Sequence, residues 1–484
     1  MHLSKGELRR LGEPFLMRRL PLLVVVLAAI LHPSASSAAA PPPGAISPNV
    51  EFIANIPEMR SAIAVNFIGD TMLVSATTGL FAYSVANPAA PSLLGALPMY
   101  IWENEDMDVD PVRKLAFISR DPRGFTSPAT SGATFPYGAV HIIDVSIPHA
   151  LRQVGFFLVP AGHTSTCVNR CDFLWTGGPY ANTTSNPGFT GRPIYATDVR
   201  DPANPVPCPA PIDTGRNDGV TDYAHDVQVD ANGVAWVSGA GGVRGYWTEG
   251  QHYNPLTDRA EEATGCSPIP YAGGGSPSEA TPSRFMHNAW RNVDATIPGE
   301  DDPNTPGDQT KGMVVYGTEE NITSNCASSG RAVTYDLRGS LDGEGWKDIA
   351  NTKYRMRALD TWTPQGQEGS TGCASAHYLD DRGDGIVAYA FYGQGTRFLD
   401  VSDPKDIRQV GYFRPDGAST WAPYFRGDYV FVADNARGID ILKFNGGPGS
   451  ATISAPDTGL LSAPSMSETF GYMCPTKVPG LSVA

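Results

Sequence analysis

The chain has 484 residues, of which 41% are hydrophobic, so it is long enough to bury a large core. Its 52 glycines and 42 prolines are spread along the sequence, which predicts many turns, as in all-β folds. The formal net charge of −15 at pH 7 excludes a typical nucleic-acid-binding protein, because an acidic surface repels phosphate backbones.

The first 40 residues have the pattern of a secretory signal peptide. Four arginines precede an apolar run over residues 20–31, and small residues from Ser34 to Ala40 suit cleavage by signal peptidase. The alternative is an uncleaved membrane anchor, which the shortness of the apolar run disfavours. We therefore expect residues 41–48 to form a linker, and the mature protein to be secreted or held at the cell surface, with no membrane span.

A degenerate repeat occupies residues 49–444. Each copy has β-rich runs opened by Gly or Asp, a second run that ends in Asp-Val-Ser, and a Pro turn before the next run. The clearest copies begin at Asp70, Gly138 and Gly385, and thinner ones at Arg192, Gly233, Gly312 and Asp428. The runs alternate apolar and polar residues, which predicts strands. A small sheet of this kind cannot bury both faces alone, so neighbouring copies must stack, and radial stacking gives a β-propeller.

Seven copies predict an all-β, seven-bladed propeller. The last copy lacks a fourth strand, and residues 49–56 resemble that strand, so we expect the N-terminal strand to close the last blade and remove an exposed edge. An open repeat array is the alternative. Residues 246–284 and 296–311 are insertions in the repeat pattern and are expected to be surface loops. Residues 445–484 are expected to be a flexible C-terminal tail.

Two of the copies resemble a known repeat. Residues 395–404 (GTRFLDVSDP) and 138–148 (GAVHIIDVSIP) are similar to the LVIVD repeat of exported and cell-surface β-propellers, and further phrases are similar to actinobacterial members of that family. The resemblance implies the fold and export, but no settled activity. On this basis we expect a monomeric binding or scaffold protein whose rim engages a protein, glycan or cell-wall ligand.

Alignment of the copies on the residue that opens each second strand reveals a set of equivalent ligand-type side chains. A step of eight residues back from Gly233 and Gly385 gives His225 and His377. Comparable steps in the neighbouring blades complete the set: Glu105, His163, His225, His287 and His377. Because these residues lie where the innermost strands begin, they are expected to converge at the mouth of the central channel.

Imidazole and carboxylate groups are the usual ligands of Zn, Cu and Fe. The set therefore predicts an alternative function, a metal-dependent enzyme, with oxidoreductases among the options, that activates water or O₂ at a multi-histidine site. Asp226 and Glu319 are expected to orient the rings. Two other interpretations remain open: a polar pocket without metal, and histidines that stabilise their own turns and were copied with the repeat.

Seven cysteines in an exported chain predict disulfides. Local spacing favours a Cys167–Cys171 pair, and repeat position favours a Cys326–Cys373 pair. A metal site at Cys167 and Cys171 is disfavoured, because no second close cysteine pair completes a tetrahedral set.

Overall fold

The computed structural model describes residues 44–102, 104–121, 138–178, 191–212, 222–240, 242–275, 285–320, 330–341, 356–364 and 375–454. All of them belong to one compact unit, Ser37–Ala484. The predicted signal peptide and most of the predicted tail lie outside these residues.

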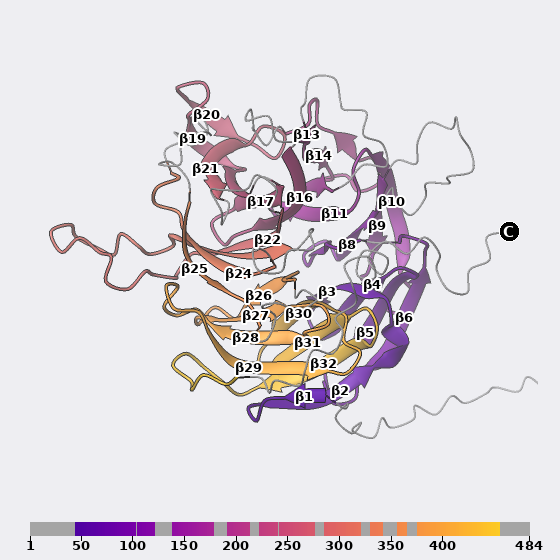
Figure 1. Cartoon of the computed structure of the whole chain (residues 1–484). Coiled ribbons are helices and arrows are strands. Elements are labelled where there is room, and N and C mark those ends of the chain that lie inside the picture. Colours follow the sequence, from indigo (N-terminus) through magenta and orange to yellow (C-terminus); the bar gives the residue numbers. More distant parts are fainter. Residues whose placement is uncertain are drawn as a thin grey trace, which may run out of the picture. The chain divides into compact units, whose positions relative to one another are not determined.

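The described residues form a seven-bladed β-propeller, as the repeat predicts (Figure 1). Blade 1 consists, from the innermost to the outermost strand, of β3 (Ala62–Ile68), β4 (Thr71–Ala76), β5 (Gly79–Ser84) and β6 (Ser92–Pro98). Blade 2 consists of β7 (Met107–Asp110), β8 (Leu115–Arg120), β9 (Gly138–Asp144) and β10 (Arg152–Val159). Blade 3 consists of β11 (Thr164–Val168), β12 (Phe173–Gly177), β14 (Tyr195–Asp198) and β15 (Val206–Pro207).

Blade 4 consists of β16 (Asp222–Val229), β17 (Val234–Ala240), β18 (Gly242–Trp247) and β21 (Ile269–Gly275), with β13 (Gly191–Arg192) parallel to β16. Blade 5 consists of β22 (Phe285–Asn292), β23 (Val314–Glu320), β24 (Ala332–Asp336) and β25 (Arg357–Trp362). Blade 6 consists of β26 (Leu379–Asp381), β27 (Ile386–Ala390), β28 (Thr396–Asp400) and β29 (Arg408–Pro415), with β1 (Gly44–Ile46) added at its outer edge.

Blade 7 is built from both ends of the repeat region. Its strands are β30 (Thr420–Arg426), β31 (Tyr429–Asp434), β32 (Gly438–Phe444) and, outermost, β2 (Val50–Ile56). The antiparallel pairing of β2 with β32 confirms that the N-terminal strand closes the last blade. A single 3-10 turn, η1 (Pro57–Met59), follows β2.

Hydrophobic clusters fill all seven boundaries between neighbouring blades in the described part of the chain. At the boundary of blades 7 and 1, for example, Phe431 and Ile441 pack with Met72 and Val74. Each innermost strand contacts the innermost strand of the next blade, and β30 contacts β3. The ring is therefore closed, and burial of apolar side chains at each boundary stabilises it.

A glycine in the outermost strand explains part of the repeat pattern. A Cβ at Gly95 would lie 2.2 Å from the carbonyl oxygen of Pro148, and one at Gly155 would lie 2.0 Å from that of Pro202. Both prolines belong to the Pro turn of the next blade. The outer strand thus carries glycine where the backbone of the next blade approaches it closely.

Two expectations were wrong. Within the predicted linker of residues 41–48, Gly44–Ile46 form β1 and pair with β29. Residues 246–284 are not only a surface loop, because they contain β21, the outermost strand of blade 4, and a hairpin of β19 (Gly250–Asn254) and β20 (Arg259–Ala263). The Gly- and Pro-rich composition of this stretch obscured its strands. Residues 296–311 contain turns and no strand. Within the described residues, none of the elements is a helix long and apolar enough to cross a membrane.

Candidate metal centre

Four of the seven equivalent positions at the starts of the innermost strands lie at a β-bulge. The pairing register of β16 with β17 shifts at His225, and that of β22 with β23 shifts at His287. The same shift occurs in blade 1 at Ile63 and in blade 7 at Trp421. A β-bulge inserts one residue and turns its side chain away from the regular alternation. The bulge therefore recurs in several blades, while the residue at the bulge differs from blade to blade.

Glu105 lies at the centre of the histidine set. Its Oε2 atom is 3.0 Å from His163 Nε2, 3.3 Å from His225 Nε2 and 3.0 Å from His287 Nε2. Its Oε1 atom is 3.4 Å from His377 Nε2. The structure thus brings together all five of the side chains that the repeat alignment selected, and the exposed fraction of each is at most 3%.

The other ring nitrogen of three histidines faces an oxygen acceptor. His163 Nδ1 is 2.8 Å from Asp121 Oδ2. His225 Nδ1 is 3.2 Å from the His287 carbonyl oxygen, and His377 Nδ1 is 2.8 Å from the Trp421 carbonyl oxygen. A carbonyl or ionised carboxylate only accepts, so each Nδ1 carries the proton and donates it.

This assignment leaves the Nε2 atoms of His163, His225 and His377 without protons. In a neutral imidazole whose Nδ1 is protonated, Nε2 presents a lone pair. The Nε2 atoms of His163 and His225 are 3.0 Å apart, so two lone pairs face one another, and both also face the Glu105 carboxylate. Glu105 Oε2 and His377 Nε2 have no hydrogen-bond partner among the described residues. A shared positive ion would satisfy all of these atoms.

Burial opposes positive charge on His225 and His287, while the surrounding histidines favour an ionised Glu105. Burial lowers the pKa of His225 well below its ordinary value, and the nearby His287 ring lowers it further. Burial and the His377 ring also lower the pKa of His287. Burial raises the pKa of Glu105, but the four histidines outweigh burial and hold that pKa well below its usual range. Neutral imidazoles at His225 and His287 and an ionised carboxylate at Glu105 are the forms that bind metal ions.

Two groups of three ligand atoms meet the spacing of a metal site. Both contain Glu105, one with His163 and His225 and the other with His287 and His377. Aromatic rings border the second group. The ring centroids of Trp421 and Tyr392 each lie 4.8 Å from the ring centroid of His377. Trp421 of blade 7 and Tyr392 of blade 6 pack with Ile63 of blade 1. Blades 7 and 1 thus carry apolar side chains at the positions where the other blades carry ligands.

The predicted orienting residues have other contacts. Asp226 accepts hydrogen bonds from Asn288 at 2.6 Å, from Gln228 at 3.2 Å and from the Tyr378 hydroxyl at 3.3 Å. Glu319 pairs with Arg331 at 2.8 Å. The carboxylate that bonds to a ring, Asp121, was missed by sequence analysis. It follows β8 rather than an innermost strand, so the alignment of strand starts does not include it.

The disulfide predictions had a mixed outcome. Cys167 and Cys171 form a disulfide, as predicted. Cys208 and Cys266 form a second one, which sequence analysis missed because the two residues are separated by 58 positions. The predicted Cys326–Cys373 pair lies outside the described residues.

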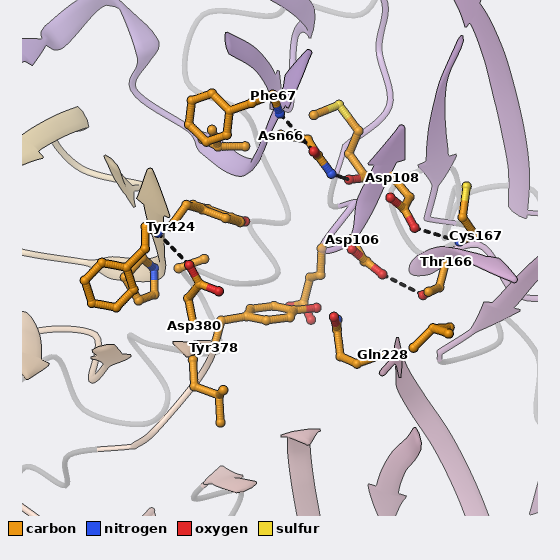
Figure 2. Close-up of a pocket in the computed structure, with 18 residues that line it drawn as sticks. Asn66, Phe67, Asp106, Asp108, Thr166, Cys167, Gln228, Tyr378, Asp380 and Tyr424 are labelled. Atoms are coloured by element: carbon orange, nitrogen blue, oxygen red, sulfur yellow. Dashed lines mark hydrogen bonds between the residues drawn. The ribbon is translucent and has the colours of Figure 1, made fainter. Parts of the chain in front are cut away.

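A cavity of about 420 Å³ continues along the channel from the centre (Figure 2). Six of the seven innermost strands or the segments that lead into them line it, and the lining residues lie further along each strand than the histidine set. Glu105 belongs to both the cavity wall and the centre. Polar side chains from opposite blades point into the space, among them Asp106, Asp108, Gln228, Tyr378 and Asp380.

The chain matches no family model and none of the curated proteins. Among solved structures, it is similar to the periplasmic gluconolactonase of Pseudomonas aeruginosa, with 14% sequence identity and a TM-score of 0.47. The alignment covers 81% of this chain and 94% of that chain.

Proposed function

We propose that this propeller is an exported metal-dependent enzyme of the oxidoreductase class. Its centre would hold a divalent transition-metal ion between the carboxylate of Glu105 and the Nε2 atoms of His163, His225, His287 and His377, which form two groups of three ligand atoms that share Glu105. The observation that carries the proposal is the protonation pattern of the rings. Three Nδ1 atoms donate to oxygen acceptors, so their Nε2 lone pairs converge on a buried carboxylate with no proton between them.

The spacing of the ligand atoms favours a particular class of ion. Two ligands at right angles, each about 2.1 Å from an ion, lie about 3.0 Å apart, whereas tetrahedral ligands lie about 3.4 Å apart. Three distances are 3.0 Å: those between the Nε2 atoms of His163 and His225, and those from Glu105 Oε2 to His163 and to His287. The distances from Glu105 to His225 and His377 are longer, at 3.3 and 3.4 Å. Five protein ligands also exceed the four that zinc sites use. We therefore favour Fe²⁺ or Cu²⁺ over Zn²⁺.

Such a site would support redox chemistry. Five protein ligands leave one position of an octahedral ion for O₂, water or substrate. Asp121 would fix the tautomer of His163 and increase the basicity of its Nε2, while backbone carbonyls do the same for His225 and His377. The apolar wall of Ile63, Tyr392 and Trp421 would keep water away from one side of the ion.

Two features support export. The Cys167–Cys171 and Cys208–Cys266 disulfides are typical of proteins that fold in an oxidising compartment. The signal-peptide pattern of residues 1–40 and the similarity of residues 138–148 and 395–404 to LVIVD repeats agree with this location.

The test is metal content. The purified chain, and the chelator-treated chain reconstituted without oxygen with Fe²⁺, Cu²⁺ or Zn²⁺, are examined by elemental analysis and thermal unfolding. We expect about one ion per chain and a higher Tm on reconstitution, because a ligand that binds only the folded state stabilises it. In the His225→Ala/His377→Ala variant both effects should be lost, while His149→Ala, which changes an exposed ring, should retain them.

Two results would count against the proposal. Stoichiometric metal in the folded His225→Ala/His377→Ala variant would exclude the assigned ligands. A parent chain that binds none of the three ions after reconstitution would leave the binding or scaffold function that the LVIVD resemblance implies. Because the double variant has the risk of misfolding, His225→Gln/His377→Gln, with polar side chains of closer size, is measured beside it.

A further inference from the structure

The cavity that continues from the histidine set is rich in carboxylates that have no Lys, Arg or His partner among the described residues. Asp106, Asp108 and Asp380 line it, and Asp226 lies beside it, bonded to the lining residue Tyr378. Asp106 accepts a hydrogen bond from the Thr166 hydroxyl at 2.6 Å. Asp108 accepts from the backbone of Val109 and of Cys167. Each of these donors is neutral.

Asp380 also has no positively charged partner among the described residues. Its Oδ2 atom accepts a hydrogen bond of 2.5 Å from the Phe425 backbone N–H. It comes from β26, whereas Asp106 and Asp108 come from the segment that contains β7, so the carboxylates lie on different walls (Figure 2). Among the described residues that line the cavity, none is Lys, Arg or His. Carboxylates that are largely removed from water without a cation are costly, so this cavity has a strong preference for positive charge.

The remaining walls suit an organic molecule rather than a bare ion. The aromatic side chains of Phe67, Tyr378, Tyr424 and Phe425 line the same space, and aromatic faces attract organic cations. A volume of about 420 Å³ is within the range of small-molecule sites. In contrast, the described groups whose spacing suits a metal ion all consist of Glu105 and histidines, and none includes Asp106, Asp108 or Asp380.

We infer that the cavity binds a small organic cation that carries primary ammonium groups. The ammonium groups would pair with the carboxylates on opposite walls, and the carbon chain would lie against the aromatic rings. Burial raises the pKa of Asp380 to about 7 and that of Asp108 to about 6, so a cation placed beside them would remove an existing electrostatic cost. This inference goes beyond the proposed metal function and does not depend on it, because the carboxylates involved are not metal ligands.

The experiment measures binding of 1,4-diaminobutane by titration calorimetry at pH 8. The neutral molecule butane-1,4-diol, which has the same carbon chain, is the matched probe. Both are titrated into the chelator-treated chain and into the metal-loaded chain. We expect the diamine to bind both forms and the diol to bind at least about tenfold more weakly, because it lacks the charge. A loss of metal binding alone would therefore leave this result unchanged.

Variants locate the binding. Asp380→Asn removes the charge and keeps an oxygen that can accept from the Phe425 N–H, so the fold should be retained, which circular dichroism checks. It should weaken diamine binding about tenfold, as should Asp108→Asn, whereas Asp416→Asn, at an exposed residue outside the cavity, should not change it. The inference is overturned by equal binding of diol and diamine, by a folded Asp380→Asn chain with parental affinity, or by binding of Ca²⁺ in place of the diamine.

Discussion

His163 and Asp121 form a buried pair in which Nδ1 of the ring lies 2.8 Å from Oδ2 of the carboxylate. This orienting contact can be removed by a side-chain substitution, whereas the Nδ1 atoms of His225 and His377 bond to backbone carbonyls. A carboxylate behind a ligating imidazole fixes its tautomer and makes the other nitrogen a stronger ligand.

Removal of this carboxylate should weaken metal binding without abolishing it. For Asp121→Ala we expect an affinity for the reconstituted ion about 10–100-fold lower, as for other partners behind a metal ligand. Asp121→Asn keeps an acceptor for Nδ1 and should fall between the parent and Asp121→Ala. Competition with a chromophoric chelator gives the affinities. Equal affinities for Asp121→Ala and the parent would show that the carboxylate does not act on the ion.

The sequence predicted the blades and the five converging side chains for one physical reason. A repeat places equivalent residues at equivalent positions, and the bulges at His225 and His287 turn those positions toward the channel axis. Asp121 follows the second strand of blade 2, and the repeat alignment does not compare residues at that position. The alignment therefore could not identify it. The Cys208–Cys266 pair likewise joins two segments whose proximity depends on how the hairpin of β19 and β20 and the strand β21 fold back.

The two disulfides should contribute unequally to stability. Cross-linking lowers the entropy of the unfolded chain, and the effect grows with the length of the closed loop. Cys208 and Cys266 are 58 positions apart, and Cys167 and Cys171 are 4 apart. On the chain-entropy scale, Cys208→Ser/Cys266→Ser should lower the free energy of unfolding by about 4 kcal/mol, and Cys167→Ser/Cys171→Ser by about 2 kcal/mol. Urea unfolding measures both, and the reverse order would contradict the loop argument.

Closure of the ring should depend on a glycine at the start of β32. Gly438 has a φ of +99°, and a Cβ there would lie 2.1 Å from the carbonyl oxygen of Ile56, at the end of the closing strand β2. Gly438→Ala should therefore lower the free energy of unfolding by more than about 3 kcal/mol, from backbone strain and displacement of β2 together.

Gly427→Ala is the matched control, because Gly427 has a φ of +59° and no atom within 4 Å of its Cβ position. Its cost, from backbone strain alone, should be about 1 kcal/mol. Similar urea midpoints for the two variants would show that close contact with β2 does not matter.

Asp380 should make the stability of the metal-free chain depend on pH. Burial raises its folded-state pKa to about 7 from an ordinary value of 3.8, so between those values the folded chain holds a proton that the unfolded chain has released. Stability from this group is therefore present at low pH and is lost as pH rises through about 7, with a slope of up to about 1.4 kcal/mol per pH unit. In Asp380→Asn this contribution is absent, so its free energy of unfolding should fall less than that of the parent between pH 5 and pH 8. Urea titrations of both chains at several pH values test this. Parallel curves would mean that Asp380 is ionised in the folded chain throughout, and that the cavity already compensates its charge.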